Sequence, residues 1–300
     1  MTVRALRVLP LLLAAGCGAE FTPRSVLFDL RVLAIDADPL EVGPDDSVTL
    51  DAYRYVPPGQ EILTETWTFC PFSVGSSVGY ACAIPQCEKG LTATGAPADP
   101  HAAPRLTASP GALVRECLAL LSGSAAPPPE VPEKVEVLFR YEVETAAAPG
   151  GTEPAGSRQA VLRLPLYPAG APADRNVAPV ISSVTIGGLA VPPPDGTNPL
   201  LRPGADLDVR VVLAPESAQT YDEGGRMLTE QLVVSFYTTA GRFDYDWANG
   251  PDAAVKLRHD ETGGAAGARV WVVARDLRGG QTVGGPYQVT IEQAAPATIP

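Results

Sequence analysis

The eight residues Ser47–Arg54, SVTLDAYR, decide the fold class of this chain. Their apolar residues Val48, Leu50 and Ala52 alternate with polar or aromatic neighbours. A period of two is typical of a β-strand that buries one face and exposes the other. A proline-led turn begins at Pro44, just before the run. The stretch therefore predicts a strand on the surface of a sheet.

Similar runs recur along the whole chain. The 32 prolines and 29 glycines are spread between short β-branched runs and do not gather in one tract, which is typical of an all-β sandwich or barrel. One short helix is expected, at Gly111–Leu121. The other strands expected in the first half are Ser25–Asp36, Glu65–Phe69, Lys134–Glu144 and Arg158–Tyr167.

The second half repeats the order of the first. The tripeptide LTE occurs at Leu63–Glu65 and again at Leu228–Glu230, each time at the start of an apolar run. A proline-led turn and an alternating strand precede each copy, and a late hairpin follows it. We therefore expect two copies of one unit, and we expect MLTEQLVVSFY, Met227–Tyr237, to be one strand of the second copy.

Two stretches of the second half carry a family resemblance. NVAPVISSVTI, Asn176–Ile186, resembles the opening of the immunoglobulin-like modules of bacterial surface proteins, including their cadherin and polycystic-kidney-disease-repeat relatives. ARVWVVARDLRGG, Ala268–Gly280, resembles their penultimate strand. The resemblance implies an all-β fold of two immunoglobulin-like β-sandwich domains in tandem, the first with a cysteine-rich insertion and a short helix. It also implies that Trp67 packs between the sheets.

A proline-rich stretch, PAGAPADRNVAP, marks the boundary between the units. Such a composition favours an extended, semi-rigid spacer, so we expect residues 168–179 to hold the sandwiches end to end. The expected domains are residues 27–167 and residues 180–293, followed by a tail at 294–300.

The N-terminus has the composition of an export signal. Arg4 and Arg7 are followed by the apolar run Val8–Ala15, so residues 1–16 are expected to be a signal peptide. AAGC, Ala14–Cys17, resembles a bacterial lipobox, in which the cysteine becomes the lipidated first residue of the mature protein.

That resemblance implies palmitate-type chains on Cys17 and a tether at residues 17–26. Gly18 stands where an aspartate would retain an enteric lipoprotein at the inner membrane. We therefore expect a lipoprotein of the cell outer membrane that faces the periplasm or the surface.

The cysteine count is consistent with lipidation. The chain has five cysteines, and an odd one in an exported protein needs an explanation. Apart from Cys17, the cysteines are Cys70, Cys82, Cys87 and Cys117. In an oxidising compartment they predict two disulfides, with three pairings open. A zinc site is the alternative, although the close C-x2-C pairs of such sites are absent.

Catalytic signals are weak. The chain has only two histidines, His101 and His259, and no nucleophile elbow, zinc-protease or phosphate-binding motif. Its 34 acidic residues mostly alternate with apolar ones, as on solvated strand faces. The net charge of −12 becomes −14 without the two arginines of residues 1–16, which argues against nucleic acid as a partner.

The stretch FDYDWANGPD is the densest acidic cluster. Asp244, Asp246, Asn249 and Asp252 offer oxygen ligands that calcium accepts. The alternative, which we favour, is a hairpin with its turn at Asn249–Gly250 and with solvated carboxylates.

The same stretch is aromatic. Strand alternation would place Phe243, Tyr245 and Trp247 on one side. Aromatic rings beside carboxylates can stack on sugars, so Tyr245 and Trp247 are candidate glycan contacts. The alternative, which we favour, is that all three rings pack in the core.

These observations predict a non-catalytic, lipid-anchored cell-envelope protein that acts as a protein-interaction or scaffold module. The alternatives are a glycan-binding surface module and a divergent envelope hydrolase. The expected partners are the membrane, through the lipid, and another envelope protein or a polysaccharide. No cofactor is expected apart from the calcium considered above.

Overall fold

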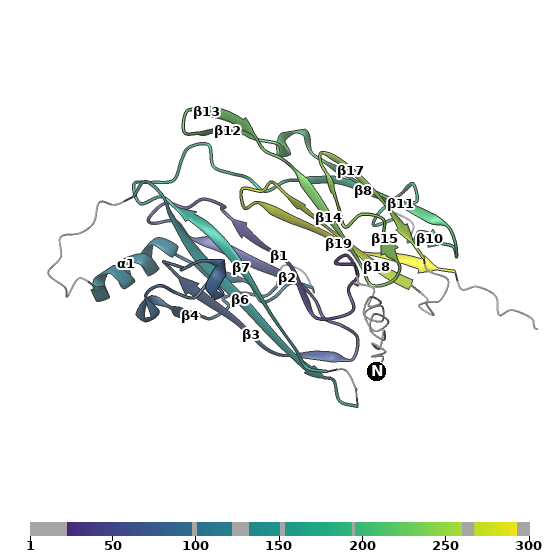
Figure 1. The fold of residues 1–300 in the computed structure, drawn as a ribbon, viewed down its shortest axis with the longest axis horizontal. Coiled ribbons are helices and arrows are strands. Elements are labelled where there is room, and N and C mark those ends of the chain that lie inside the picture. Colours follow the sequence, from purple (N-terminus) through teal and green to yellow (C-terminus); the bar gives the residue numbers. More distant parts are fainter. Residues whose placement is uncertain are drawn as a thin grey trace, which may run out of the picture.

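The computed structural model describes residues 23–97, 101–121, 132–150, 154–193, 196–259 and 267–292. The predicted signal peptide, Cys17 and the first part of the tether lie outside these ranges. The described residues form two β-sandwiches that lie side by side (Figure 1). We call them the N-terminal and the C-terminal sandwich.

The N-terminal sandwich has a three-stranded and a four-stranded sheet. The first sheet has the order β1-β2-β5, formed by β1 (Arg31–Asp38), β2 (Val48–Tyr55) and β5 (Leu106–Ala108). The second has the order β4-β3-β6-β7, formed by β4 (Lys89–Leu91), β3 (Gln60–Cys70), β6 (Val135–Ala147) and β7 (Gly156–Leu166).

Strand alternation builds the core between these two sheets. Val48, Leu50 and Ala52 of β2 are all fully buried, which confirms the period-two reading of this strand. Trp67 of β3 is also buried, and its ring lies 5.0 Å from that of Tyr141 on β6. The tryptophan therefore packs between the sheets as the family resemblance implied.

The four cysteines lie in the insertion between β3 and β5 and in the elements β3 and α1 (Pro110–Leu121) that flank it. The insertion holds the 3-10 turns η1 (Ser76–Val78) and η2 (Pro85–Cys87), and α1 follows β5. Disulfides join Cys70 to Cys82 and Cys87 to Cys117. Two disulfides are thereby confirmed and the zinc alternative is wrong, because the sulfurs are bonded to one another. In the described ranges, no helix combines the length and apolar character needed to cross a membrane.

The C-terminal sandwich has two five-stranded sheets. One has the order β10-β19-β18-β14-β16 and the other β15-β17-β11-β8-β9. The strands of the first sheet are β10 (Leu200–Leu201), β14 (Val233–Thr238), β16 (Trp247–Asn249), β18 (Gly267–Arg275) and β19 (Gln281–Ile291). Those of the second are β8 (Ile181–Ile186), β9 (Leu189–Ala190), β11 (Asp206–Leu213), β15 (Arg242–Phe243) and β17 (Asp252–Arg258).

Both sandwiches use one strand order. In the N-terminal sandwich, β1 and β2 share a sheet with β5, and β3 pairs with β6 in the other sheet. In the C-terminal sandwich, β8 and β11 share a sheet with β17, and β14 pairs with β18 in the other sheet. The last strand of each sandwich also has a parallel partner. In the N-terminal sandwich Val42 pairs with Leu166 of β7, and in the C-terminal sandwich β10 pairs with β19. This division of strands is that of immunoglobulin-like sandwiches. The chain is therefore an all-β protein with two immunoglobulin-like domains in tandem.

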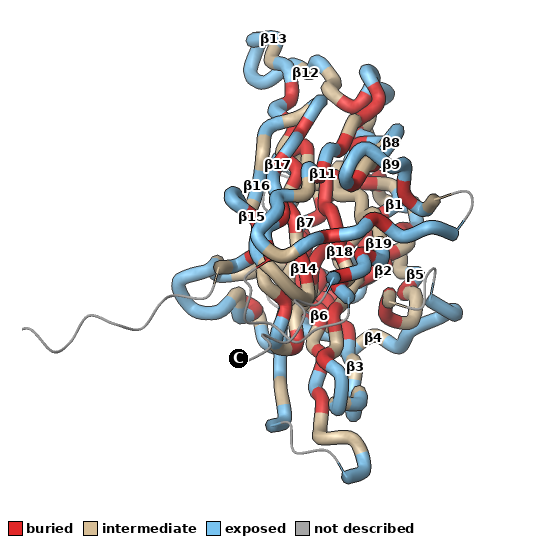
Figure 2. Tube along the Cα trace, turned by 90° about the vertical axis from the view of Figure 1, so that its right-hand side faces the viewer, coloured by how far each residue is buried: buried red, intermediate tan, exposed pale blue. Residues whose placement is uncertain are grey.

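The second LTE run is not part of one long strand. Its residues up to Thr229 belong to β13 (Arg226–Thr229), which forms a hairpin with β12 (Thr220–Glu223), and β14 begins only at Val233. This β12–β13 hairpin projects from the body of the sandwich, at the top of Figure 2. The expected strand Met227–Tyr237 is wrong because Arg226–Thr229 pair with β12 in the hairpin, whereas the pairing with β18 begins only at Val233.

The two sandwiches do not stand end to end. The outer faces of β1 and β2 pack against the outer face of β18, and six buried apolar residues form the contact: Leu27, Leu33, Ala34, Tyr55, Trp271 and Val273. Trp271 is 1% exposed, and its ring meets that of Tyr55 edge-on at 5.8 Å. The rod-like arrangement that we expected is wrong because β18 is apolar on both faces and requires cover on both.

Candidate functional site

The N-terminal segment is built into the junction between the sandwiches. Val26 pairs in parallel with Thr238, at the end of β14. The amide of Leu27 donates to the carbonyl of Thr238 at 2.7 Å, and the amide of Thr238 donates to that of Ser25 at 2.8 Å. The Leu27 side chain is buried among the interface residues. The end of the proposed tether and the residue that follows it therefore contact both sandwiches.

Arginine and glutamine side chains from the C-terminal sandwich bind the backbone of β1. Leu33 is the extra residue of a bulge in β1, and its carbonyl accepts a hydrogen bond from Arg275 Nη2 at 2.9 Å. Gln281 Nε2 donates to the carbonyl of Ile35 at 3.2 Å. A bulge leaves ladder groups unpaired, and here the neighbouring domain satisfies one of them.

A buried ionic network closes the other side of the junction. Arg278 Nη1 lies 2.6 Å from Glu230 Oε1, and its Nη2 lies 3.6 Å from Glu41 Oε1. Its guanidinium also stacks over the Tyr221 ring at 4.1 Å. Burial raises the pKa of Glu230, although the amide of Gln219 and the Arg278 guanidinium act in the opposite direction. One arginine thus bridges carboxylates from both sandwiches.

The proline-rich stretch is fixed to the same network. The amide of Asn176 donates to Glu41 Oε2 at 2.9 Å, and Asn176 Nδ2 donates to Asp276 Oδ2 at 3.0 Å. The hydroxyl of Tyr167 donates to Glu41 at 3.1 Å. Burial, followed by the Glu41 charge, raises the pKa of this tyrosine to about 12. The connection is therefore anchored at its ends and does not behave as a free spacer.

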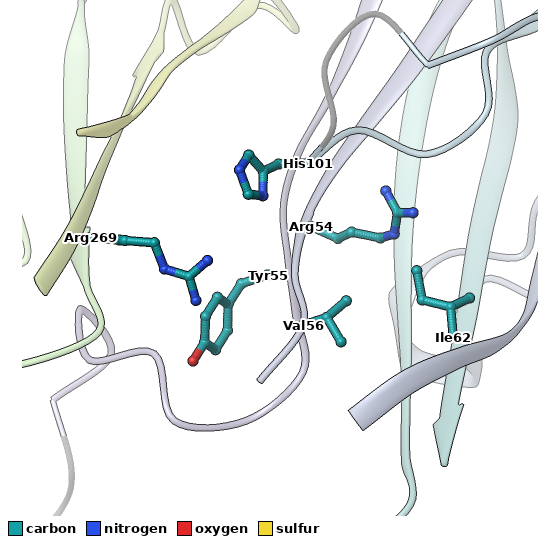
Figure 3. Close-up of a pocket in the computed structure, with 6 residues that line it drawn as sticks. All are labelled: Arg54, Tyr55, Val56, Ile62, His101 and Arg269. Atoms are coloured by element: carbon teal, nitrogen blue, oxygen red, sulfur yellow. The ribbon is translucent and has the colours of Figure 1, made fainter. Parts of the chain in front are cut away.

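A cavity of about 220 Å³ opens beside the junction. It is lined by Arg54, Tyr55, Val56, Ile62, His101 and Arg269 (Figure 3). Arg269 stacks over the Tyr55 ring at 5.7 Å, and the His101 ring lies edge-on to Trp271 at 6.1 Å. Figure 3 shows that Arg54 points away from these groups. It pairs with Glu65 at 2.7 Å instead, so the basic groups of this cavity do not converge on one point.

A second cavity of about 220 Å³ lies beside α1 and has an apolar lining that includes Leu91, Leu106 and Leu113. Both cavities are smaller than the ~300 to 1,000 Å³ of typical small-molecule sites. His259 lies outside both cavities, buried just after β17.

The structure does not gather the carboxylates of the acidic cluster into one group. Within the described ranges, which include residues 196–259, no three His, Cys, Asp or Glu side chains gather so as to hold a metal. Asp244 Oδ1 accepts the amides of Tyr245 and Lys256 at 3.0 and 2.8 Å. Asp252 binds Arg210 at 2.6 Å, and this hydrogen bond lowers the pKa of the Asp252 carboxyl. The carboxylates of Asp244 and Asp252 are thus bound within the protein.

The expected hairpin turn at Asn249–Gly250 is also wrong. Here the chain crosses from β16 in one sheet to β17 in the other. Asn249 ends β16, and the backbone carbonyl of Asp246, just before β16, binds β14. Asp252 lies in the other sheet, where it binds Arg210. The crossing separates the four proposed ligands.

The aromatic residues of the same stretch separate as well. Phe243 is buried in the core, whereas Tyr245 is 69% exposed and Trp247 is 56% exposed. The common core position that we favoured is therefore wrong for two of the three rings. The reason is an earlier crossing between the sheets, because Phe243 belongs to β15 in one sheet and Trp247 to β16 in the other. Alternation holds only within one strand.

The exposed pair has an aromatic neighbour that sequence analysis missed. Phe28 is 57% exposed and directly follows Leu27, the residue that binds Thr238 on β14. The expected strand Ser25–Asp36 included Phe28, but β1 begins only at Arg31, so alternation along that strand did not indicate that this ring is exposed. Three exposed aromatic residues therefore flank the edge of β14.

No protein-family model matches this sequence, and no curated protein matches it. Among solved structures, the D0-D1 domain of Intimin is 12% identical with a TM-score of 0.23, over 86% of this chain and 98% of that chain. The native conformation of E. coli alpha-2-macroglobulin is 12% identical with a TM-score of 0.23, over 91% of this chain and 16% of that one. The D00-D0 domain of Intimin is 11% identical with a TM-score of 0.19, over 86% and 96% of the two chains. The immunoglobulin-like assignment accordingly rests on the strand order of the sandwiches themselves.

Proposed function

We propose that this protein is a non-catalytic lipoprotein of the cell outer membrane that presents a rigid two-domain body to another envelope protein. The observation that carries the proposal is the position of the N-terminal segment. Residues Ser25 and Leu27 are hydrogen-bonded to β14 and buried between the sandwiches. An anchor at Cys17 would therefore hold both domains near the membrane as one unit.

The polar groups of the junction support a structural role. Catalytic groups need free, convergent side chains with matched pKa values. Here Arg278 binds both Glu230 and Glu41, and Arg54 binds Glu65. The pairs of Arg278 link the two domains, and the Arg54–Glu65 pair links the two sheets of the N-terminal sandwich.

The β12–β13 hairpin is the surface that we propose for the partner protein. It extends beyond the sandwich (Figure 2), and Met227 on it is 67% exposed. Exposed methionine adapts to varied apolar surfaces. A photo-crosslinking residue at Met227 should give a discrete adduct in cells, while the same residue at the exposed position Leu200 should not.

Labelling with palmitate tests whether Cys17 carries the proposed lipid anchor. In a Gram-negative host that is fed labelled palmitate, the full chain should take up label and enter the detergent phase, and C17S should do neither. Thermal melting of C17S should match that of the wild type, because Cys17 lies before the folded body. Equal labelling of both chains would exclude Cys17 as the anchor.

A further inference from the structure

We propose that Phe28, Tyr245 and Trp247, the aromatic edge, rest in the headgroup region of the bilayer to which Cys17 attaches the protein. The inference rests on the proposed lipid anchor and adds a second, non-covalent membrane contact. It assigns a phospholipid bilayer as the occupant of this exposed surface.

The three residues flank one edge of β14. The amide of Phe236 donates to the carbonyl of Asp246 at 2.9 Å, which places Tyr245 and Trp247 along this edge. Two residues further on, Thr238 binds Ser25 and Leu27. Two residues of a strand span only about 7 Å. The N-terminal segment therefore enters the fold next to the exposed aromatic pair, with Phe28 just beyond it.

The short tether keeps this edge near the membrane. Pro23 is the first described residue and lies six positions after Cys17. Six residues reach at most about 20 Å when fully extended. The lipidated cysteine itself lies at the bilayer surface. The side of the molecule that the chain enters, which carries the aromatic edge, is therefore the side held against the headgroups.

The chemistry of the edge suits a shallow contact. Tryptophan and tyrosine prefer the membrane interface because they join an apolar ring to a polar N–H or O–H group. The exposed Arg24, beside the entry point, would bind anionic headgroups. Asp244 and Asp246 on the same loop oppose deeper insertion. A contact at the depth of the headgroups places the aromatic rings at the membrane interface and leaves the carboxylates in water.

Intrinsic fluorescence can test this contact. The chain has three tryptophans, of which Trp67 and Trp271 are 3% and 1% exposed and Trp247 is 56% exposed. A quencher in lipid or water therefore reaches mainly Trp247. The lipidated full chain is placed in phosphatidylethanolamine–phosphatidylglycerol vesicles that contain lipid brominated near the headgroups. We expect clear quenching by this lipid and a several-fold decrease in quenching by aqueous acrylamide, relative to soluble C17S.

Two variants serve as controls. W247F should abolish both responses while the emission of the two buried tryptophans persists. W247F/M227W moves the exposed tryptophan to the β12–β13 hairpin, at a position that is 67% exposed. Its emission should be quenched by acrylamide and unaffected by brominated lipid.

The outcomes separate the contact from the anchor. If mass spectrometry shows the lipid on Cys17 and Trp247 stays open to acrylamide in vesicles, the contact is overturned and the anchor stands. If Cys17 carries no lipid, the anchor is overturned. An N-terminal histidine tag on nickel-chelating vesicles then tests the contact by the same quenching. Protection of Trp247 by soluble polysaccharide, without quenching by brominated lipid, would assign the edge to glycans and overturn the membrane contact.

Discussion

At the level of single residues, Asp36 stands out among the described carboxyl groups because its pKa lies well above its ordinary value. It lies directly opposite Asp51 in the pairing of β1 with β2. Burial, together with the charges of Asp51 and Asp38, raises the pKa of Asp36 to about 6, although the amide of Ala37 and the charge of Arg105 act in the opposite direction. The folded state therefore holds a proton on Asp36 that the unfolded chain releases near pH 4.

This raised pKa predicts lower stability at higher pH. A carboxyl with a higher pKa in the folded state favours folding less as pH rises from about 4 to about 6. Between pH 4.5 and pH 7.5 Asp36 should lower the free energy of unfolding by about 2 kcal/mol. Urea unfolding of D36N should lack this part of the pH dependence, whereas D38N, at an exposed position of the same strand, should keep it. Identical pH profiles for D36N and wild type would contradict the assignment.

Arg278 is the residue on which the buried network depends. The side chain of Glu230 is 0% exposed, so R278A leaves a buried charge without its partner, which costs about 3 to 5 kcal/mol. Chemical denaturation should show this loss, and R278A/E230Q should recover part of it. R202A is the matched control, because Arg202 and Glu292 form an exposed pair worth only about 0 to 1 kcal/mol.

Among the secondary-structure elements, α1 depends most on a covalent bond. Only Pro110, Gly111 and Cys117 of its twelve residues are buried, and Cys117 is bonded to Cys87 of the insertion. The helix thus buries little apolar surface of its own. The disulfide supplies much of its attachment.

Removal of this disulfide should therefore loosen α1 first. Bridges that close loops of this length contribute about 2 to 4 kcal/mol, so C87A/C117A should lower the melting temperature. It should also expose α1 to limited proteolysis. C70A/C82A, which opens the other bridge, should destabilise the insertion and leave α1 protected. Equal proteolysis of α1 in both variants would show that its attachment does not depend on Cys117.

β18 shows why strand prediction stops short of the tertiary arrangement. Its run of apolar residues predicts a strand, and Val270 and Val272 do face the core of their own sandwich. The intervening Trp271 and Val273 face the other domain. Apolar residues on both faces indicate that both are covered, but they do not identify what covers each face.

At the level of the whole molecule, the shared apolar contact should make the two sandwiches unfold together. W271A removes the largest side chain of that contact, and large-to-small changes of this kind cost about 3 to 5 kcal/mol. We expect one calorimetric transition in the wild type and two in W271A. W247A, at an exposed tryptophan, should retain the single transition. A single unshifted transition in W271A would show that the domains are not coupled through this contact.

From the sequence alone we could predict most of the strands, the short helix, the repeat of one unit and the oxidised cysteines, although the strand expected at Met227–Tyr237 is divided in the fold. Each follows from local patterns such as the alternation in Ser47–Arg54 and the four cysteines between Cys70 and Cys117. The disulfide pairing, the lateral packing of the sandwiches and the exposure of Tyr245 and Trp247 became evident only in the folded arrangement. The physical reason is that alternation reports which residues avoid water, whereas the surface that covers them comes from segments far away in the chain. Where the chain crosses between sheets after Phe243, alternation carries no information, and the exposure of the next two aromatic rings depends on the fold.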